Sequence, residues 1–123
     1  MAEKQKTLKN SFTIEGVGLH TGKMTTITVK PSEPDSWYVF KRTDLPNQPT
    51  IKADVDNVLS TRRGTTLGND HMEVNTTEHI LAALYGMGVD NALIELDGPE
   101  IPILDGSSRF FVEAIEKSGL QDQ

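Results

Sequence analysis

The chain has 123 residues, of which 36% are hydrophobic and 24% charged, and it carries a formal net charge of −6 with no cysteine. This composition fits one folded domain and argues against disorder. The acidic balance does not fit a protein that binds nucleic acid through its phosphates, and the lack of cysteine excludes disulfides and thiolate zinc sites. Residues 1–10 hold no apolar signal core and no stretch has membrane-spanning length, so we expect a cytoplasmic protein without a transmembrane segment.

The first part of the chain is predicted to form strands, because β-branched and aromatic residues alternate there between turn residues. The clearest strand is KMTTITVKP, residues 23–31, which ends at a proline. Residues 7–22 before it are expected to begin as a strand and to end in the glycine-rich turn GVGLHTG. Further strands are expected at residues 37–44, 50–59 and 62–68, with a turn and a brief strand at 69–74.

Two helices and one strand are predicted in the remainder. NTTEHILAALYGMG, residues 75–88, has apolar residues at helical spacing, with Asn75 as the expected N-cap and glycines at the end. Residues 90–98 read as a buried strand, and a second helix is expected to begin at Ser107 or Ser108 and to stop at Gly119. This order predicts an α+β fold: a two-layer sandwich of a mostly antiparallel sheet, with about five main strands, and two helices on one face.

Glu78 and His79, in the first turn of the first helix, admit a structural and a chemical interpretation. The spacing Asn75-x-x-Glu78 matches a capping box, which spacing alone favours, and the alternative for Glu78 is a general base. The positive end of the helix favours a neutral His79 ring, the form that binds metals. Adjacent helical residues point about 100° apart, so one could bind a metal while the other holds a metal-bound water.

The sequence does not complete a metal site. A catalytic zinc ion usually has three protein ligands, and neither His20 nor His71 has ligand spacing to His79. Both are expected to be exposed loop histidines. Asp105 is expected to be a turn or N-cap aspartate beside Gly106, with a buried supporting carboxylate as the alternative.

Two further motifs favour structural interpretations. The segment EGVGLHTG lacks the spacing and the strand–loop–helix context of a phosphate-binding loop, so we interpret it as a turn between strands. The basic residues in FKRTD and STRRG typically protect strand edges, although they could also meet a phosphate or a carboxylate. These residues are Lys41, Arg42, Arg62 and Arg63.

Four segments together resemble the N-terminal half of the UDP-3-O-acyl-N-acetylglucosamine deacetylases, zinc enzymes of lipid A synthesis. They are TLKNSFTIEGVGLHTGK, KRTD, TTEHILAALYGMGVDNALIEL and PEIPILDGSSRFFVEAI, and they cover nearly the whole chain in the same order. The resemblance implies a parent protein of two similar domains whose helical layers face each other around the active site. It implies hydrolysis of the N-acetyl group of a UDP-linked, 3-O-acylated glucosamine, with release of acetate.

The resemblance also implies roles for individual residues. His79 would be one zinc ligand, Glu78 the general base and Asp105 a supporting active-site carboxylate, while His20 would lie near the site. The family's other two zinc ligands and a catalytic histidine belong to the second domain, so residues 1–123 correspond to the first domain alone. Some family members are also fused to a hydroxyacyl-carrier-protein dehydratase.

We therefore expect the first domain alone to be inactive, to hold zinc weakly and to self-associate through its exposed interdomain face. Two alternatives remain open. One is a stand-alone module that binds a nucleotide-sugar or a protein without catalysis, and the other is a purely structural domain.

Overall fold

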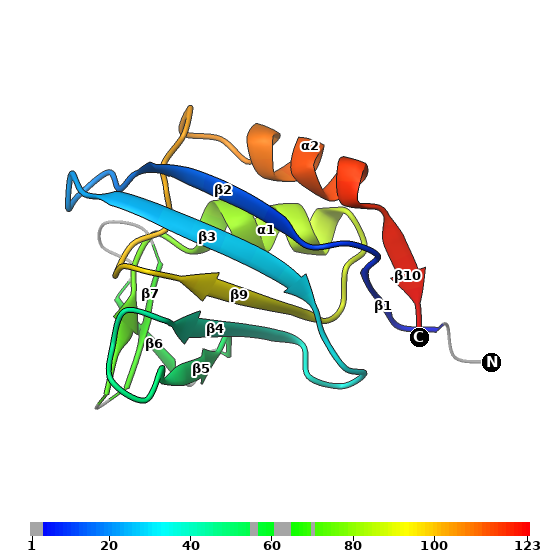
Figure 1. Ribbon diagram of the computed structural model, residues 1–123, viewed down its shortest axis with the longest axis horizontal. Coiled ribbons are helices and arrows are strands. Elements are labelled where there is room, and N and C mark those ends of the chain that lie inside the picture. Colours follow the sequence, from blue (N-terminus) through cyan, green and yellow to red (C-terminus); the bar gives the residue numbers. More distant parts are fainter. Residues whose placement is uncertain (1–3, 55–56, 61–64, 70) are drawn as a thin grey trace.

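A five-stranded sheet carries the fold in the computed structural model, which describes residues 4–54, 57–60, 65–69 and 71–123 (Figure 1). In spatial order its strands are β2 (Phe12–Val17), β3 (Met24–Pro31), β9 (Ala92–Leu96), β4 (Tyr38–Arg42) and β5 (Thr50–Lys52). All neighbours are antiparallel except β4 and β9, which are parallel. The mostly antiparallel five-stranded sheet is confirmed, and β9 lies at its centre as its apolar run predicted.

The two central strands bury alternate residues, as a sheet covered on one face requires. On β3 the buried residues include Ile27 and Val29, and on β9 they include Ile94 and Leu96. The opposite face carries Glu95, whose carboxylate pairs with the Nζ of Lys30 at 2.8 Å. The buried apolar residues of β3 and β9 therefore share one face of the sheet, opposite Glu95.

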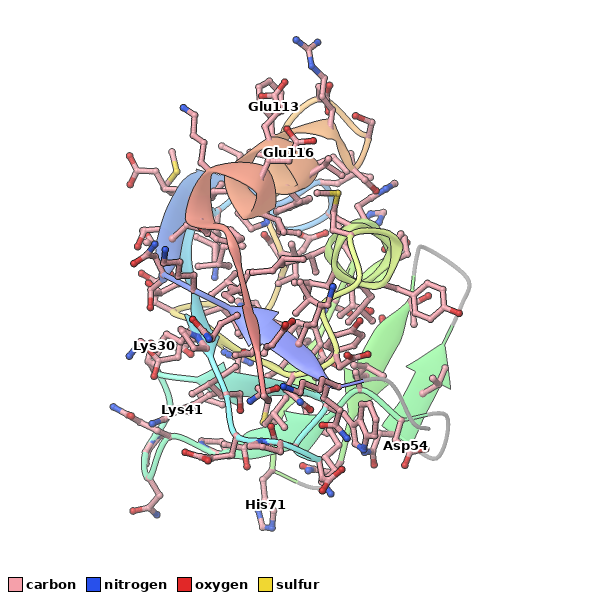
Figure 2. The ribbon with its side chains drawn as sticks, turned by 90° about the vertical axis from the view of Figure 1, so that its right-hand side faces the viewer. Lys30, Lys41, Asp54, His71, Glu113 and Glu116 are labelled. Carbon is pink, nitrogen blue, oxygen red and sulfur yellow. The ribbon has the colours of Figure 1, made fainter. Side chains whose placement is uncertain are left out.

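Two helices cover the apolar face: α1 (Glu78–Gly86) and α2 (Arg109–Ser118). Both lie on the same side of the sheet (Figures 1 and 2). Each contributes fully buried side chains to the common core, among them Ile80 and Leu84 from α1 and Phe111 and Ile115 from α2. The predicted two-layer α+β sandwich with two helices is therefore confirmed. Among the residues described, no helix is long and apolar enough to cross a bilayer.

Two small sheets were not anticipated as separate units. One contains β6 (Val58–Ser60), β7 (Thr66–Gly68) and β8 (Glu73–Val74), and the other pairs β1 (Lys6–Leu8) with β10 (Leu120–Asp122). The expected strand at 7–22 is thus divided between β1 and β2, and the expected strand at 50–59 between β5 and β6. The alternating pattern does not mark these breaks, and β10 has no buried side chain to reveal it. Residues 62–64 of the expected strand at 62–68 lie outside the described residues.

The predicted start of the first helix is wrong. The helix begins at Glu78 with Thr77 as its N-cap, and Asn75 instead forms a β-bridge with Glu100. The amide of Asn75 donates to the carbonyl of Pro99 at 2.8 Å, so Glu78 cannot complete a capping box with it. Thr76, between them, has a positive φ of 60° and turns the chain into the helix. The second helix begins after Ser108 and stops at Gly119, as predicted.

Candidate active site at the start of helix α1

The carboxylate of Glu78 is held by one oxygen only. Its Oε2 accepts a hydrogen bond from the amide of Thr65 at 3.1 Å. Thr65 is fixed in turn, because its carbonyl accepts from the amide of Thr77 at 3.1 Å and from the Thr77 hydroxyl at 3.2 Å. The other oxygen, Oε1, is buried and has no hydrogen-bond partner among the described residues. A buried acceptor without a partner is costly, and such atoms are typical of functional sites.

His79 follows directly and is tied to the second helix through its backbone. Its carbonyl accepts a hydrogen bond from the Oγ of Ser108 at 3.0 Å. Ser108 is the N-cap residue of α2, but its side chain does not cap that helix. The bond instead joins the start of α2 to the first turn of α1. His79 is half-buried in the first turn of its helix.

Asp105 lies in the loop that precedes α2 and is exposed. Its Oδ1 accepts hydrogen bonds from the Oγ of Ser107 at 2.7 Å and from the Ser107 amide at 3.0 Å. These bonds hold the pKa of Asp105 below its ordinary value. Gly106 has a φ of 82°, as in a turn, so Asp105 is a turn aspartate as expected. The same loop reaches His79 through Ser108, and a chemical role for Asp105 stays a prediction.

The other two histidines are both exposed, as expected, but they lie in different surroundings. His71 lies between β7 and β8, where its amide donates to the Oδ1 of Asn69 at 2.8 Å. It is at the opposite end of the molecule from Glu113 and Glu116 on α2 (Figure 2). His20 lies in the turn between β2 and β3, and its amide donates to both carboxylate oxygens of Glu100, at 3.1 Å each.

Glu100 is the residue that the sequence analysis missed. It is fully buried, and besides His20 it accepts from the amide of Thr21 at 2.9 Å and from the hydroxyl of Thr76 at 2.7 Å. Burial raises its pKa, but the hydrogen bonds from Thr21, Thr76 and His20 outweigh this effect and the pKa lies below its ordinary value. The only signal in the sequence was an acidic residue between the prolines of PEIPIL.

The basic residues of FKRTD have partners within the domain. Arg42 is buried and makes two hydrogen bonds to Asp44, at 2.8 and 2.7 Å, and one to the carbonyl of Glu73 at 2.9 Å. Lys41 lies 3.8 Å from the carboxylate of Glu95. Because β4 is an inner strand that pairs with both β9 and β5, the expected protection of a strand edge is wrong for these two residues, whose charges are paired within the domain instead. Arg62 and Arg63 lie outside the described residues.

The described residues fit part of a zinc site. They supply one imidazole, that of His79, beside a carboxylate with an unpartnered oxygen, that of Glu78. No group of three or more histidine, aspartate or glutamate side chains that could hold a metal occurs in the part of the chain that the structure describes. Because a catalytic zinc ion usually takes three protein ligands, the remaining ligands would have to come from another polypeptide segment.

Comparisons with known proteins identify the family of this chain. Residues 5–123 match the family model described as UDP-3-O-acyl N-acetylglycosamine deacetylase. A protein of Citrifermentans bemidjiense named UDP-3-O-acyl-N-acetylglucosamine deacetylase is 50% identical over 117 residues, which are 95% of this chain and 38% of that protein. A protein of Bacteroides thetaiotaomicron named bifunctional enzyme LpxC/FabZ is 51% identical over 120 residues, which are 98% of this chain and 26% of that protein. The chain thus spans well under half the length of these relatives.

Proposed function

Because the chain belongs to the UDP-3-O-acyl N-acetylglycosamine deacetylase family, we propose that it is the first domain of a two-domain, zinc-dependent hydrolase of lipid A synthesis. The reaction would remove the N-acetyl group from a UDP-linked, 3-O-acylated glucosamine and release acetate. The second domain would supply the metal ligands that the described residues lack. The cytoplasmic location expected from the sequence stays a prediction.

The chain's own residues would divide the work at the start of α1. His79 would hold the metal through its neutral imidazole. When bound, zinc lowers the pKa of a water molecule and polarises a carbonyl oxygen. Glu78 would accept a proton at Oε1, because its other oxygen is already engaged by the amide of Thr65 and fixes the carboxylate in place. This division between the two oxygens of Glu78 is the observation that carries the proposal.

Asp105 would act as a supporting carboxylate. Hydrogen bonds from Ser107 lower its pKa further below neutral, and its loop is joined to His79 by Ser108. A fixed negative charge at this position would favour a cationic group of the second domain.

The helical layer offers a surface for the second domain. Tyr85 on α1 is 81% exposed and Phe110 on α2 is 41% exposed. Beside α2, a groove of about 240 Å³ is lined by the apolar residues Ile14, Leu104, Phe110 and Ala114 and by the charged residues Glu113 and Lys117. Apolar side chains gathered on an exposed face favour a partner surface, so we expect self-association where the second domain is missing.

Acetate release from the UDP-sugar tests the proposal, measured with residues 1–123 alone and together with the second domain in the presence of zinc. We expect turnover and tight zinc binding only when both are present. Glu78→Gln should lower kcat by about 10²- to 10⁴-fold without changing the zinc content, whereas His79→Ala should also lower the zinc content. The matched control is Glu95→Gln, on the polar face of the sheet.

Full turnover by residues 1–123 alone would refute the two-domain proposal. Binding of the UDP-sugar by this chain, with no turnover after the second domain is added, would favour the alternative of a binding module without catalysis.

A further inference from the structure

Glu100 is a buried carboxylate that joins two segments far apart in the sequence. It lies in the loop after β9 and is 0% exposed. It accepts hydrogen bonds from the amides of His20 and Thr21, which lie 80 and 79 positions earlier in the sequence. It also accepts a hydrogen bond from the hydroxyl of Thr76, 24 positions earlier. No lysine or arginine among the described residues forms an ion pair with it, and backbone and hydroxyl groups donate hydrogen bonds to this charge.

The bonds from His20 and Thr21 explain the glycine-rich turn. Successive amides that point into one concavity usually bind an external anion such as a phosphate. Here the concavity already holds the side chain of Glu100. Gly18 permits this approach, because a Cβ on it would lie 2.9 Å from the Cδ of Glu100. The turn is therefore an anion site filled from within the fold.

The bond from Thr76 acts on the other segment. A β-branched residue at a φ of 60° is strained and persists only where its surroundings hold it. The hydroxyl bond to Oε2 of Glu100 and the backbone bond from Ile101 to Asn75 at 3.1 Å do so. Thr76 is two residues before Glu78, so its conformation sets where α1 begins and how its first side chains are directed.

We propose that Glu100 is a positioning residue whose carboxylate fastens the His20 turn to Thr76 and thereby sets the orientation of Glu78 and His79. The inference rests on the proposed function of these two residues. Glu100 touches no substrate in this scheme. It acts by holding the strained backbone of Thr76, just before α1, and by fixing the His20 turn next to this segment.

The test uses the complete two-domain protein with zinc bound and compares Glu100→Ala, Glu100→Gln and the matched control Glu95→Ala. Glu100→Ala removes all the acceptors. Glu100→Gln keeps an oxygen for the amides of His20 and Thr21, and its amide group can donate to the Thr76 hydroxyl. Turnover is measured per folded molecule, well below the melting temperature of each variant, and the imidazole NMR signals of the three histidines are recorded.

We expect Glu100→Ala to lower kcat by about 10- to 100-fold with little change in KM, because small displacements of reacting groups have effects of this size. The ring signals of His20 and His79 should shift, and that of His71 should not. Glu100→Gln should restore both kcat and the signals, and Glu95→Ala should resemble the wild type.

Two results would overturn the proposal. One is that Glu100→Ala changes neither the His79 signal nor kcat. The other is that Glu100→Gln lowers kcat as much as Glu100→Ala does. If the wild-type protein releases no acetate, the proposed function fails. The His79 signal still decides in that case whether Glu100 orients the start of α1.

Discussion

Replacing Gly18 by alanine probes the tightest packing around the buried carboxylate. The new Cβ would lie 2.7 Å from the Oγ1 of Thr21 and 2.9 Å from the Cδ of Glu100, and closer still to Oε1. Real Cβ atoms essentially never approach within 3.0 Å, so an atom must move. Thr21 is exposed and can rotate its side chain. Glu100 cannot move without weakening its bonds to His20, Thr21 and Thr76.

The expected cost follows from these two effects. Overpacking of a buried site costs about 1–3 kcal/mol. Each hydrogen bond to a charged group contributes about 1.5–3 kcal/mol, and only part of that is lost when the carboxylate shifts rather than leaves. We therefore expect Gly18→Ala to lower the free energy of unfolding by about 2–3 kcal/mol. For a chain of this size the melting temperature should fall by roughly 6–15 °C.

Thermal unfolding followed by circular dichroism measures this change, and Gly86→Ala is the matched control. Gly86 is the last residue of α1, and a Cβ there would meet nothing within 4 Å. Alanine in that helical position should leave stability unchanged or raise it by up to about 1 kcal/mol.

A double variant separates crowding from other causes. If the new methyl group clashes with the side chain of Glu100, Gly18→Ala should cost less than about half as much free energy of unfolding in a protein that already carries Glu100→Ala. A Gly18→Ala protein that melts within about 2 °C of the wild type, or an unchanged cost in the double variant, would refute the reasoning.

Two further predictions concern Thr76 and Tyr38. Thr76→Val removes a donor from the buried Glu100 carboxylate and should lower the free energy of unfolding by about 1.5–3 kcal/mol, whereas Thr76→Ser keeps the hydroxyl and should cost less than about 0.5 kcal/mol. Equal denaturant midpoints for the two variants would contradict this difference. Burial raises the pKa of Tyr38 to about 12, with smaller contributions from Asp90 and Tyr85. Because the folded-state pKa is raised above the ordinary value near 10, its stabilising contribution is complete below about pH 10 and is lost as the pH rises towards 12. Tyr38→Phe should weaken this alkaline loss of stability, and phenolate absorbance of the wild type should show a transition near 12 that the variant lacks.

Helices and strands that bury one face were predictable, because their apolar residues recur at regular intervals along the sequence. Alternation in residues 23–31 and the apolar run in residues 90–98 predicted the inner strands β3 and β9, and helical spacing in residues 75–88 and 107–119 predicted both helices. The resemblance carried by four segments predicted the family, and the match over residues 5–123 confirms it. The sequence also singled out Glu78 and His79 in the first turn of the first helix, and their chemical roles stay a prediction.

Other features depend on partners that are distant in sequence. The capping box at Asn75 was wrong because the Asn75 amide is taken by Pro99, 24 residues away, and no local pattern records that bond. The strand β10 has only exposed side chains and exists through its backbone pairing with β1.

The sequence by itself determined the layers, the family and the two residues at the start of α1, because one-sided burial and local motifs are written in neighbouring positions. Only the tertiary structure decided how those residues are held. Glu78 accepts a hydrogen bond from a backbone amide, the His79 carbonyl accepts one from the hydroxyl of Ser108, and the Thr76 hydroxyl donates one to Glu100. These partners come from loops that meet only in the folded chain. Hydrogen bonds between such loops have no sequence period, since their geometry depends on the whole path of the backbone between them.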